Sequence, residues 1–570
     1  MHAIVLGMYL RTTSRRNVDG STVQYCQLAE NVWDREKGCA VARVVYNFGR
    51  ADQLDREALR RLVRSILRLF SPEEAIDADP ELRLIDSWPY GGMHVLDSLW
   101  RELGIQAVME KQLGASGVRQ PFERALFAMV ANRALHPFSK LYCHEQWLPE
   151  EAFFPGKEKL ELHHLYGAMD FLEAHKEEVE KAIYFQVADL MNADVDLIFY
   201  DTTSLHFEID EEDEQASHGS KAAGEKEYPA LRKRGKSKNG RGDAPQLVVG
   251  LAVTRDGLPV RSWVFPGSTN DGTTVEQIKA DLRGWKLGRC VLVGDAGMNS
   301  EENRRKLALG GGKYILASRM RAGDEVSKKV LTRAGRYHTL AGNLRVKEVV
   351  VGDGERRQRY VVCHNPDEAE RQRRHREKVL RELRVELAIL KPPAKGKRHS
   401  KRTCELLTKE RYHRYLLETK RGKLRISQTA IRAEEKLDGK WVVTSNDDTL
   451  SAEDLALGYK QLMRVEECWR TMKSGLKTRP IYHWRPHRIC AHISLCVLAL
   501  LLERVAEIRA GDTWRNIVAK LQTVKVVEYE RAGARITQTT ELRGNVSTLL
   551  RTLGIPAPPK VHDVRSTTHA

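Results

Sequence analysis

Two aspartates follow strongly apolar runs, and each could take part in metal-dependent chemistry. Asp201 stands in "LIFYDTTS" and Asp295 in "VLVGDAGMNS". An ionised carboxylate beside so much apolar sequence costs free energy unless something compensates its charge. Carboxylates from two strands and a helix form the oxygen-rich site that Mg²⁺ or Mn²⁺ prefers, and two such ions can promote in-line attack on phosphorus. Taken singly, either residue could instead be a turn or helix-cap residue.

The elements around these aspartates predict a mixed α/β sheet. Three strands, a helix, a strand, a helix and a strand follow one another from about residue 195, and the first strand is expected to end at Asp201. Asn299 or Ser300 is a plausible cap for the second helix. The expected strands and helices are "VDLIFYDTTSLHFE", "QLVVGLAVT", "VRSWVFPG", "TTVEQIKADLRGW" (helix), "RCVLVGDAG", "NSEENRRKLALG" (helix) and "KYILASRM".

The rest of the chain divides by its periodicity. A β-rich module with a hairpin is expected at the N-terminus, followed by a helical region in which DNA binding is plausible. The charged segment 208–242 is expected to be partly mobile, and a very basic helix over 368–390 precedes the basic linker "KPPAKGKRHSKR". The expected divisions are 1–85 (β-rich), 86–193 (helical), 194–319 (first part of the α/β core), 320–440 (insertion), 441–508 (second part of the core) and 509–570 (C-terminal region).

The composition favours a polyanionic partner. The chain has 570 residues, enough for about two to four domains, and its 41% hydrophobic residues are ample for folded cores. The net charge is +17 and the isoelectric point about 9.4. Nucleic acid is the first candidate and an anionic membrane surface the second.

Membrane insertion and a disulfide framework are not indicated. The basic residues of "MHAIVLGMYLRTTSRR" follow the apolar run, which is not the order of a signal peptide. The apolar stretch 489–502 contains His492, is too short to span a bilayer and predicts a buried helix. The nine cysteines form no Cys-x-x-Cys pair. A soluble, reducing compartment, the cytoplasm, is therefore expected.

A third acid comes from an amphipathic segment with helical periodicity, 450–474, which contains the adjacent Glu466 and Glu467. Within it, "GYKQLMRVEECWRTMKSG" resembles a signature of Tyr, two residues, Arg, three residues, Glu, six residues and Lys. Tyr459, Glu466 and Lys473 hold three of these places. Leu462 occupies the Arg place, and Arg464 lies two residues further on. The signature is that of bacterial insertion-sequence transposases of the DDE type.

The resemblance extends over about residues 196–502. The segments that are similar to the family are "GKSKNGRGDAPQLVVGLAV", "GLPVRSWVFPGSTNDGTTV", "GDAGMNSEEN" and "LKTRPIYHWRPHRICAHISLCVLALLL". The resemblance implies an α/β, RNase H-like mixed-sheet core with an insertion domain. In it, Asp201, Asp295 and Glu466 would form a catalytic triad that binds Mg²⁺ or Mn²⁺, as two ions. It further implies that Tyr459, Lys473 and, in place of the missing Arg, Arg464 contact DNA.

Helical geometry distinguishes Glu466 from Glu467. Residues seven apart lie nearly in line on a helix, so Tyr459, Glu466 and Lys473 are predicted to share one face. Glu467 is rotated by roughly 100° from that face. A salt bridge to Arg470 is the structural role open to either acid.

The remaining candidates are less specific. His483, His487 and His492 lack the spacing of a zinc site, and His492 is expected to pack within its apolar helix. Trp469 and Trp484 could stack on a flipped base or be core aromatics. The basic tracts 232–241, 371–384 and 391–402 are either solvated faces or DNA-backbone contacts.

The predicted function is that of a DDE transposase. It would cleave double-stranded DNA at the terminal inverted repeats of its element and transfer the ends into target DNA, working as a dimer in the DNA complex near the bacterial nucleoid. Two alternatives stay open: a catalytically inactive DNA-binding regulator, and an RNase H-like nuclease without strand transfer. A cleavage and strand-joining assay with Mg²⁺ distinguishes the three.

Overall fold

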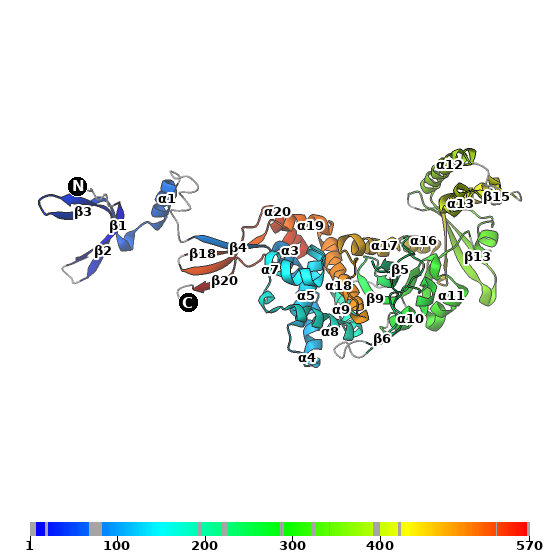
Figure 1. Ribbon diagram of the computed structural model, residues 1–570, viewed down its shortest axis with the longest axis horizontal. Helices are drawn as coiled ribbons and strands as arrows, with labels where there is room; N and C mark the ends of the chain where they lie inside the picture. Colours follow the sequence, from blue (N-terminus) through cyan, green and yellow to red (C-terminus); the bar gives the residue numbers. More distant parts are fainter. Residues whose placement is uncertain are drawn as a thin grey trace. The chain divides into compact units, whose positions relative to one another are not determined.

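The structure is a computed structural model of the chain (Figure 1). Two compact units are present: Met1–Asp86 with Glu528–Thr537 and Val561–Ala570, and Ser87–Val527 with Gln538–Lys560. The structure describes residues 7–17, 21–67, 82–191, 196–218, 226–238, 240–285, 287, 290–321, 325–340, 342–390, 399–419, 423–531 and 533–566.

The first unit begins with an antiparallel three-stranded sheet in the order β1-β2-β3. Gly38, with φ of +60°, lies in the turn between β2 and β3, where a left-handed backbone suits glycine. The hairpin predicted for the N-terminus is confirmed. The elements here are β1 (Tyr9–Arg16), β2 (Thr22–Asp34), β3 (Cys39–Arg50), η1 (Ala51–Gln53) and α1 (Arg56–Leu67).

A second sheet combines a strand that precedes the helical region with three strands from the C-terminal part of the chain. Its order is β20-β19-β18-β4. The four strands are β4 (Arg83–Pro89), β18 (Lys525–Arg531), β19 (Ala534–Thr539) and β20 (Val561–Ser566).

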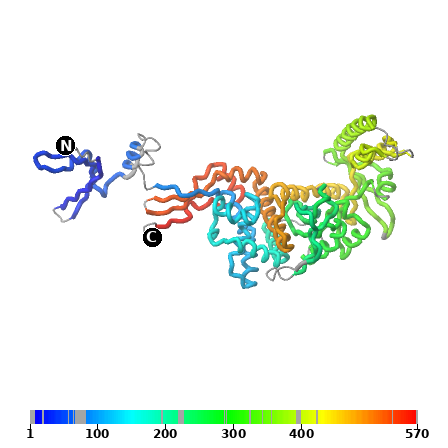
Figure 2. The backbone as a smooth tube through the Cα atoms, viewed as in Figure 1, coloured from blue at the N-terminus to red at the C-terminus, as the bar shows by residue number. Residues whose placement is uncertain are grey.

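The predicted helical region is confirmed, and it packs around a long helix from much later in the chain. This helix, α18 (Pro486–Ala510), contacts α5 and α8, so cyan and orange segments lie side by side in Figure 2. The other elements are α3 (Gly91–Glu102), α4 (Ile105–Ala115), α5 (Phe122–Leu135), α6 (Lys140–Tyr142), η2 (Cys143–Trp147), α7 (Leu148–Glu151), η3 (Lys157–Lys159), α8 (Leu162–Ala174), α9 (Lys176–Leu190), α19 (Trp514–Leu521) and α20 (Gly544–Leu553).

The length predicted for this apolar helix was wrong. The helix has 25 residues, and by length and composition alone it could cross a membrane. However, 94% of its apolar 18-residue stretch is buried inside the protein. Polar residues at both ends hid its true length, because they extend the helix without extending the apolar run. The prediction that it is buried is confirmed.

A nine-stranded mixed sheet organises the second unit. Its order is β12-β13-β14-β17-β11-β10-β5-β8-β9, and β5, β10 and β11 run parallel to one another. Every other neighbouring pair is antiparallel. The strands are β5 (Leu197–His206), β8 (Gln246–Val253), β9 (Pro259–Pro266), β10 (Val291–Gly294), β11 (Lys313–Ser318), β12 (His338–Thr339), β13 (Arg345–Val351), β14 (Gln358–His364) and β17 (Lys440–Ser445).

Central strands of this sheet are buried on both faces, which explains their continuous apolar runs. Along β5, Leu197 and Phe199 belong to one hydrophobic core, whereas Ile198 and Tyr200 belong to another. The second core also contains residues of the two predicted helices, found as α10 (Asp271–Gly284) and α11 (Glu301–Ala308). Ser300 caps α11 by accepting a hydrogen bond from the backbone N–H of Asn303, at 3.1 Å.

Segment 320–440 contributes both to the sheet and to a small separate core. Strands β12, β13 and β14 extend the main sheet, and the predicted basic helix is found as α12 (Pro366–Ala388). Most of the basic linker, 391–398, lies outside the described residues. The elements of the small core are α12, α13 (Lys401–Thr408), α14 (Glu410–His413), β15 (Leu416–Glu418), β16 (Leu424–Ile426) and α15 (Gln428–Glu435).

The charged segment 208–242 is anchored to the core at particular residues, while most of its described side chains are exposed or half-buried. Tyr228 and Leu231 are buried in the main core, and Lys233 pairs with Gln246 through two backbone hydrogen bonds of 3.1 and 3.0 Å. Two short strands, β6 (Ser217–His218) and β7 (Glu227–Tyr228), pair with each other. Residues 219–225 and 239 lie outside the described residues.

Candidate functional site

The register of the sheet brings the two aspartates to neighbouring positions. Strands β5 and β10 are parallel, with Gly294 opposite Tyr200. The next residues along the two strands are Asp201 and Asp295, and paired strands lie about 4.8 Å apart. Strand β5 was predicted to end at Asp201. It continues instead to His206, because the polar "TTS" pairs with β8.

Asp201 is held in a setting that disfavours its negative charge. Its side chain is 20% exposed. Burial raises the pKa of its carboxyl to about 6, the positive charge of Lys238 and a backbone hydrogen bond from Thr202 oppose this rise, and the charges of Asp295 and Asp271 add to it. A cation placed here would therefore stabilise the ionised form.

Glu466 approaches from a helical segment that is broken rather than continuous. The predicted helix 450–474 is found as α16 (Ala452–Lys460), α17 (Met463–Arg470) and a π-helical turn, η9 (Thr471–Gly475). The break between α16 and α17 means that the seven-residue spacing alone does not set one continuous face.

Tyr459 contacts Asp295 and lies near the other two acids. Its phenol O–H donates a hydrogen bond to Oδ1 of Asp295 at 3.5 Å. Burial raises the pKa of this phenol, and the negative charges of Asp295, Glu466 and Asp201 raise it further. Tyr459, near the end of α16, and Glu466, in the first turn of α17, therefore both lie toward the aspartates of the sheet.

Glu467 and Arg464 lie apart from this group. Arg464 Nη1 donates to Oε2 of Glu467 at 2.9 Å, so both side chains are engaged with each other rather than with the aspartates. For Glu467, the structural role that Arg470 could have filled is taken by Arg464. Leu462, which stands at the Arg place of the signature, is 7% exposed and packs in the main core.

Lys473 does approach the aspartates. Burial lowers the pKa of its ammonium, the nearby charges of Arg479 and Lys238 lower it further, and Asp201 raises it. Arg479 contacts His206 at the end of β5, where its Nη1 lies 2.8 Å from the His206 Nδ1. A group of cations thus adjoins the acids, as a phosphate-binding site requires.

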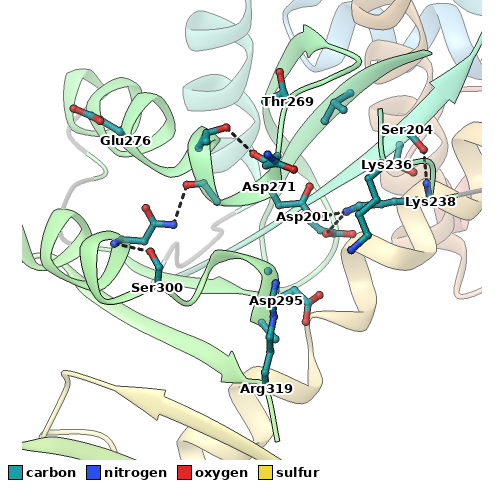
Figure 3. Close-up of a pocket in the computed structure, with 18 of the residues that line it drawn as sticks. Asp201, Ser204, Lys236, Lys238, Thr269, Asp271, Glu276, Asp295, Ser300 and Arg319 are labelled. Carbon is teal, nitrogen blue, oxygen red and sulfur yellow. Dashed lines mark hydrogen bonds and ion pairs between the residues drawn. The ribbon is translucent and has the colours of Figure 1, made fainter. Parts of the chain in front are cut away.

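Asp201 and Asp295 line a cleft of about 910 Å³, which also contains functional candidates that the sequence did not indicate (Figure 3). Lys236 and Lys238 come from the loop between β7 and β8, Asp271 begins α10, and Arg319 follows β11. The many polar residues in "GKSKNGRGD" and "GSTNDGTT" were the sequence feature that could have indicated these cleft residues. Within the described residues, Glu466 and Tyr459 do not belong to the lining of this cleft.

Lys238 and Asp271 form a cage of polar contacts beside Asp201. The Lys238 Nζ lies 3.1 Å from Asp271 Oδ2 and 3.7 Å from Asp201 Oδ1. It also donates to the carbonyl oxygen and the Oγ1 of Thr202, both at 2.7 Å. The Thr202 hydroxyl donates in turn to Asp271. Figure 3 shows Asp201, Asp271 and Lys238 pointing toward one another.

The chemistry of this donor set fits a divalent cation. Carboxylate oxygens are the ligands that Mg²⁺ and Mn²⁺ prefer, and the Lys238 ammonium is a stand-in positive charge beside Asp201. The ligands are not already assembled, since no three His, Cys, Asp or Glu side chains in the described ranges are grouped closely enough to hold a metal ion.

The histidine and tryptophan candidates separate by burial. His492 is 1% exposed and its Nε2 lies 3.1 Å from the carbonyl oxygen of Thr478, so it packs inside α18 as predicted. Trp469 is 6% exposed and is a core aromatic. Trp484 is 67% exposed, with the Arg232 guanidinium 5.0 Å from its ring centre. Of the two tryptophans, only Trp484 is available for stacking.

Comparison with known families identifies the class of protein. Residues 217–502 match the family model described as "Transposase DDE domain", and residues 10–78 match "IS1634 family transposase, N-terminal domain". The first match covers half of the chain and begins after Asp201. The chain belongs to the DDE transposase family. Its two matches together make it a bacterial insertion-sequence transposase.

Other comparisons add little. None of the curated proteins matches the chain. Among solved structures, the piggyBac transposase synaptic complex with hairpin DNA is similar over 70% of each chain, with 8% sequence identity and a TM-score of 0.33. A likeness of that size supports no conclusion about the fold or the DNA substrate of this chain.

Proposed function

We propose that segments 194–319 and 441–508 form an RNase H-like catalytic core, with 320–440 as its insertion. The order β9-β8-β5-β10-β11 supports this proposal, as do the parallel β5, β10 and β11 and the antiparallel β8. The remaining divisions are proposed as a β-rich module, 1–85, a helical DNA-binding region, 86–193, and a C-terminal region, 509–570.

The proposed reaction is transposition of the element that carries this protein. The protein hydrolyses phosphodiester bonds at the element ends and joins the freed 3′-hydroxyl to target DNA by transesterification. Mg²⁺ or Mn²⁺, bound as two ions, would activate the attacking oxygen and stabilise charge on the leaving oxygen. Double-stranded DNA is the partner, and pairing of two ends implies a dimer in the DNA complex. The cytoplasm, at the nucleoid, is the inferred location.

Each residue has a proposed role at the cut. Asp201, Asp295 and Glu466 would hold the divalent ions. Tyr459 donates a hydrogen bond to Asp295 and so orients that carboxylate. Lys473, a cation near Asp201, would contact the phosphate of the scissile strand. Arg464 is a weaker candidate for DNA contact, because it pairs with Glu467.

One observation carries the proposal for the site. The Tyr459 phenol donates a hydrogen bond to Asp295 at 3.5 Å, and its pKa is raised by burial and by the nearby charges of Asp295, Glu466 and Asp201, which are far apart in the sequence. A DNA-binding regulator without catalysis would need no such convergence. A nuclease without strand transfer would need the same three acids, so only an assay of strand joining distinguishes it from a transposase.

The adjacent glutamates offer a matched test. Glu466→Gln and Glu467→Gln make the same chemical change one residue apart on α17. With Mg²⁺ and DNA carrying the element ends, Glu466→Gln should lose cleavage and strand joining but keep end binding. Glu467→Gln should keep most activity, because its partner is Arg464. An inactive Glu467→Gln beside an active Glu466→Gln would contradict the assignment. Cleavage without joined products in the wild-type protein would favour the nuclease.

A further inference from the structure

The ammonium of Lys238 lies beside Asp201 among oxygen atoms of the kind that a bound cation would contact. Four oxygen atoms lie around its Nζ: the carbonyl oxygen and Oγ1 of Thr202 at 2.7 Å, Asp271 Oδ2 at 3.1 Å and Asp201 Oδ1 at 3.7 Å. Both carboxylate side chains are largely buried, with 27% and 20% exposure for Asp271 and Asp201. The protein thus supplies its own positive charge to the cleft.

A divalent ion and the ammonium cannot both stay in these positions. Mg²⁺ binds carboxylate oxygens at about 2.0–2.1 Å, so an ion on Asp201 would lie close to the Lys238 Nζ. Two cations at that separation in a partly buried cleft repel each other strongly. Binding of the ion to Asp201 therefore requires that the side chain of Lys238 moves away.

The loop that carries Lys238 allows such a movement. Residues 234–238 and 240–245 belong to a loop that is closed at its base by the backbone pairing of Lys233 with Gln246. The backbone N–H of Lys238 donates to the Ser204 Oγ at 2.9 Å, which anchors the loop to β5. The side chain beyond this anchor is 38% exposed, so it can turn toward solvent while the backbone stays in place.

DNA offers the alternative partner for this ammonium. Lys473 lies near both Lys238 and Arg479, since burial lowers the pKa of the Lys473 ammonium and the charges of these two residues lower it further. A phosphate held by Lys473 and Arg479 would attract the Lys238 side chain as well. The arrival of a phosphodiester would then draw the ammonium from the aspartates and leave them for the divalent ion.

We propose that the Lys238 ammonium competes with the divalent ion for the carboxylates of Asp201 and Asp271. It pairs with these carboxylates in the DNA-free protein, and the ion replaces it when DNA binds. The inference rests on the proposed metal-dependent function. It assigns Lys238 and Asp271, which lie outside the three predicted acids, to the control of that site. Its consequence is that DNA and the divalent ion bind cooperatively, because each favours the state in which Lys238 has moved.

Mn²⁺ binding to the DNA-free protein is the first test. Free Mn²⁺ is measured by electron paramagnetic resonance in titrations of the wild-type protein and the Lys238→Gln variant. The variant should bind Mn²⁺ about tenfold more tightly, a change that corresponds to about 1.4 kcal/mol. Equal or weaker binding would overturn the inference, because a lysine that merely holds the loop would not oppose the ion.

Two further variants make the result specific. Lys236→Gln removes the same charge from the same loop and the same cleft, but Lys236 forms no ion pair within the described residues, so its Mn²⁺ affinity should change little. Equal tightening in both variants would reduce the effect to net charge and overturn the specific role of Lys238. The double variant Asp201→Asn with Lys238→Gln should lose the gained affinity.

Repeating the titration with random-sequence duplex DNA tests the exchange. The duplex should tighten Mn²⁺ binding about tenfold in the wild-type protein and much less in Lys238→Gln, which has no ammonium to displace. No tightening in the wild type, or equal tightening in both, would refute the exchange. If Asp201→Asn alone binds Mn²⁺ like the wild type, the proposed metal site fails. If it loses Mn²⁺ but Lys238→Gln shows no gain, only this inference fails.

Discussion

Replacing Lys140 by methionine should stabilise the protein, and the gain should depend on pH. Lys140 lies in α6, is 2% exposed, and its Nζ has no hydrogen-bond partner within the described residues. Burial lowers the pKa of its ammonium to about 7, and the positive charge of Arg133 contributes, against an opposing effect of Cys496 and Cys143. Methionine has a similar length and no charge to desolvate.

The magnitude follows from the shift in pKa. The fall from 10.5 to about 7 costs roughly 5 kcal/mol at about 1.4 kcal/mol for each pKa unit. Between these two values the unfolded chain binds more protons than the folded one, so stability rises with pH. The cost is fully present below about pH 7 and disappears as the pH approaches 10.5. Lys140→Met should therefore gain about 5 kcal/mol at pH 6 and about 2 kcal/mol at pH 9.

Urea unfolding at the two pH values, followed by circular dichroism, measures this difference. Lys157→Met is the matched control, since Lys157 Nζ donates to the carbonyl oxygens of Ala152 and Leu148 at 2.7 and 3.3 Å. It should lose about 1–3 kcal/mol, because two acceptors are left without a donor. A Lys140→Met protein that is no more stable than the wild type at pH 6, or equally stabilised at both pH values, would refute the reasoning.

The remaining predictions concern catalysis, DNA binding and the joint between helices. Asp201→Asn and Asp295→Asn should each abolish Mg²⁺- or Mn²⁺-dependent cleavage while end binding, measured by gel shift, is kept; cutting without metal by either variant would reject the assignment. DNA affinity should fall steeply with salt, with a logarithmic slope of about −0.9 for each phosphate contact; a nearly flat slope would indicate another kind of partner. Asp170→Asn should lower the urea stability by about 1–3 kcal/mol, because it weakens the charge-assisted pair between buried Asp170 and half-buried Arg488 that joins α8 to α18. Arg488 donates to Asp170 from Nε at 2.8 Å and from Nη2 at 2.9 Å. A loss below about 1 kcal/mol would show that this pair does not hold the helices together.

The sequence by itself determined the elements of the core and the two aspartates in it. Alternating and continuous apolar runs define strands and helices locally, because burial of each face depends on the period of the side chains. The choice of Glu466 over Glu467 stays a prediction, because the helix that was expected to place Tyr459 and Glu466 on one face is broken between α16 and α17. The family resemblance is supported by the matched family models. It rested on several motifs at set spacings, and no single residue carried it.

Local periodicity did not fix where elements end or break. Strand β5 continues beyond Asp201 because β8 is present to pair with it, and a partner strand is not visible in the strand's own sequence. The helix that carries Glu466 breaks between α16 and α17, and the helix after it is 25 residues long because polar residues extend it. These boundaries are set by contacts with other parts of the chain.

Only the tertiary structure decided which polar residues join the acids. Lys238 comes from the loop before β8, and Asp271 is the first residue of α10. Their contact with Asp201 depends on the order of β5, β8 and β9 and on the closure of the loop before β8. Outside helices and strands, no periodic pattern predicts the direction in which a side chain points. Its partner is chosen by the folded backbone and by electrostatic attraction over a few ångströms, and neither exists before the sheet has formed.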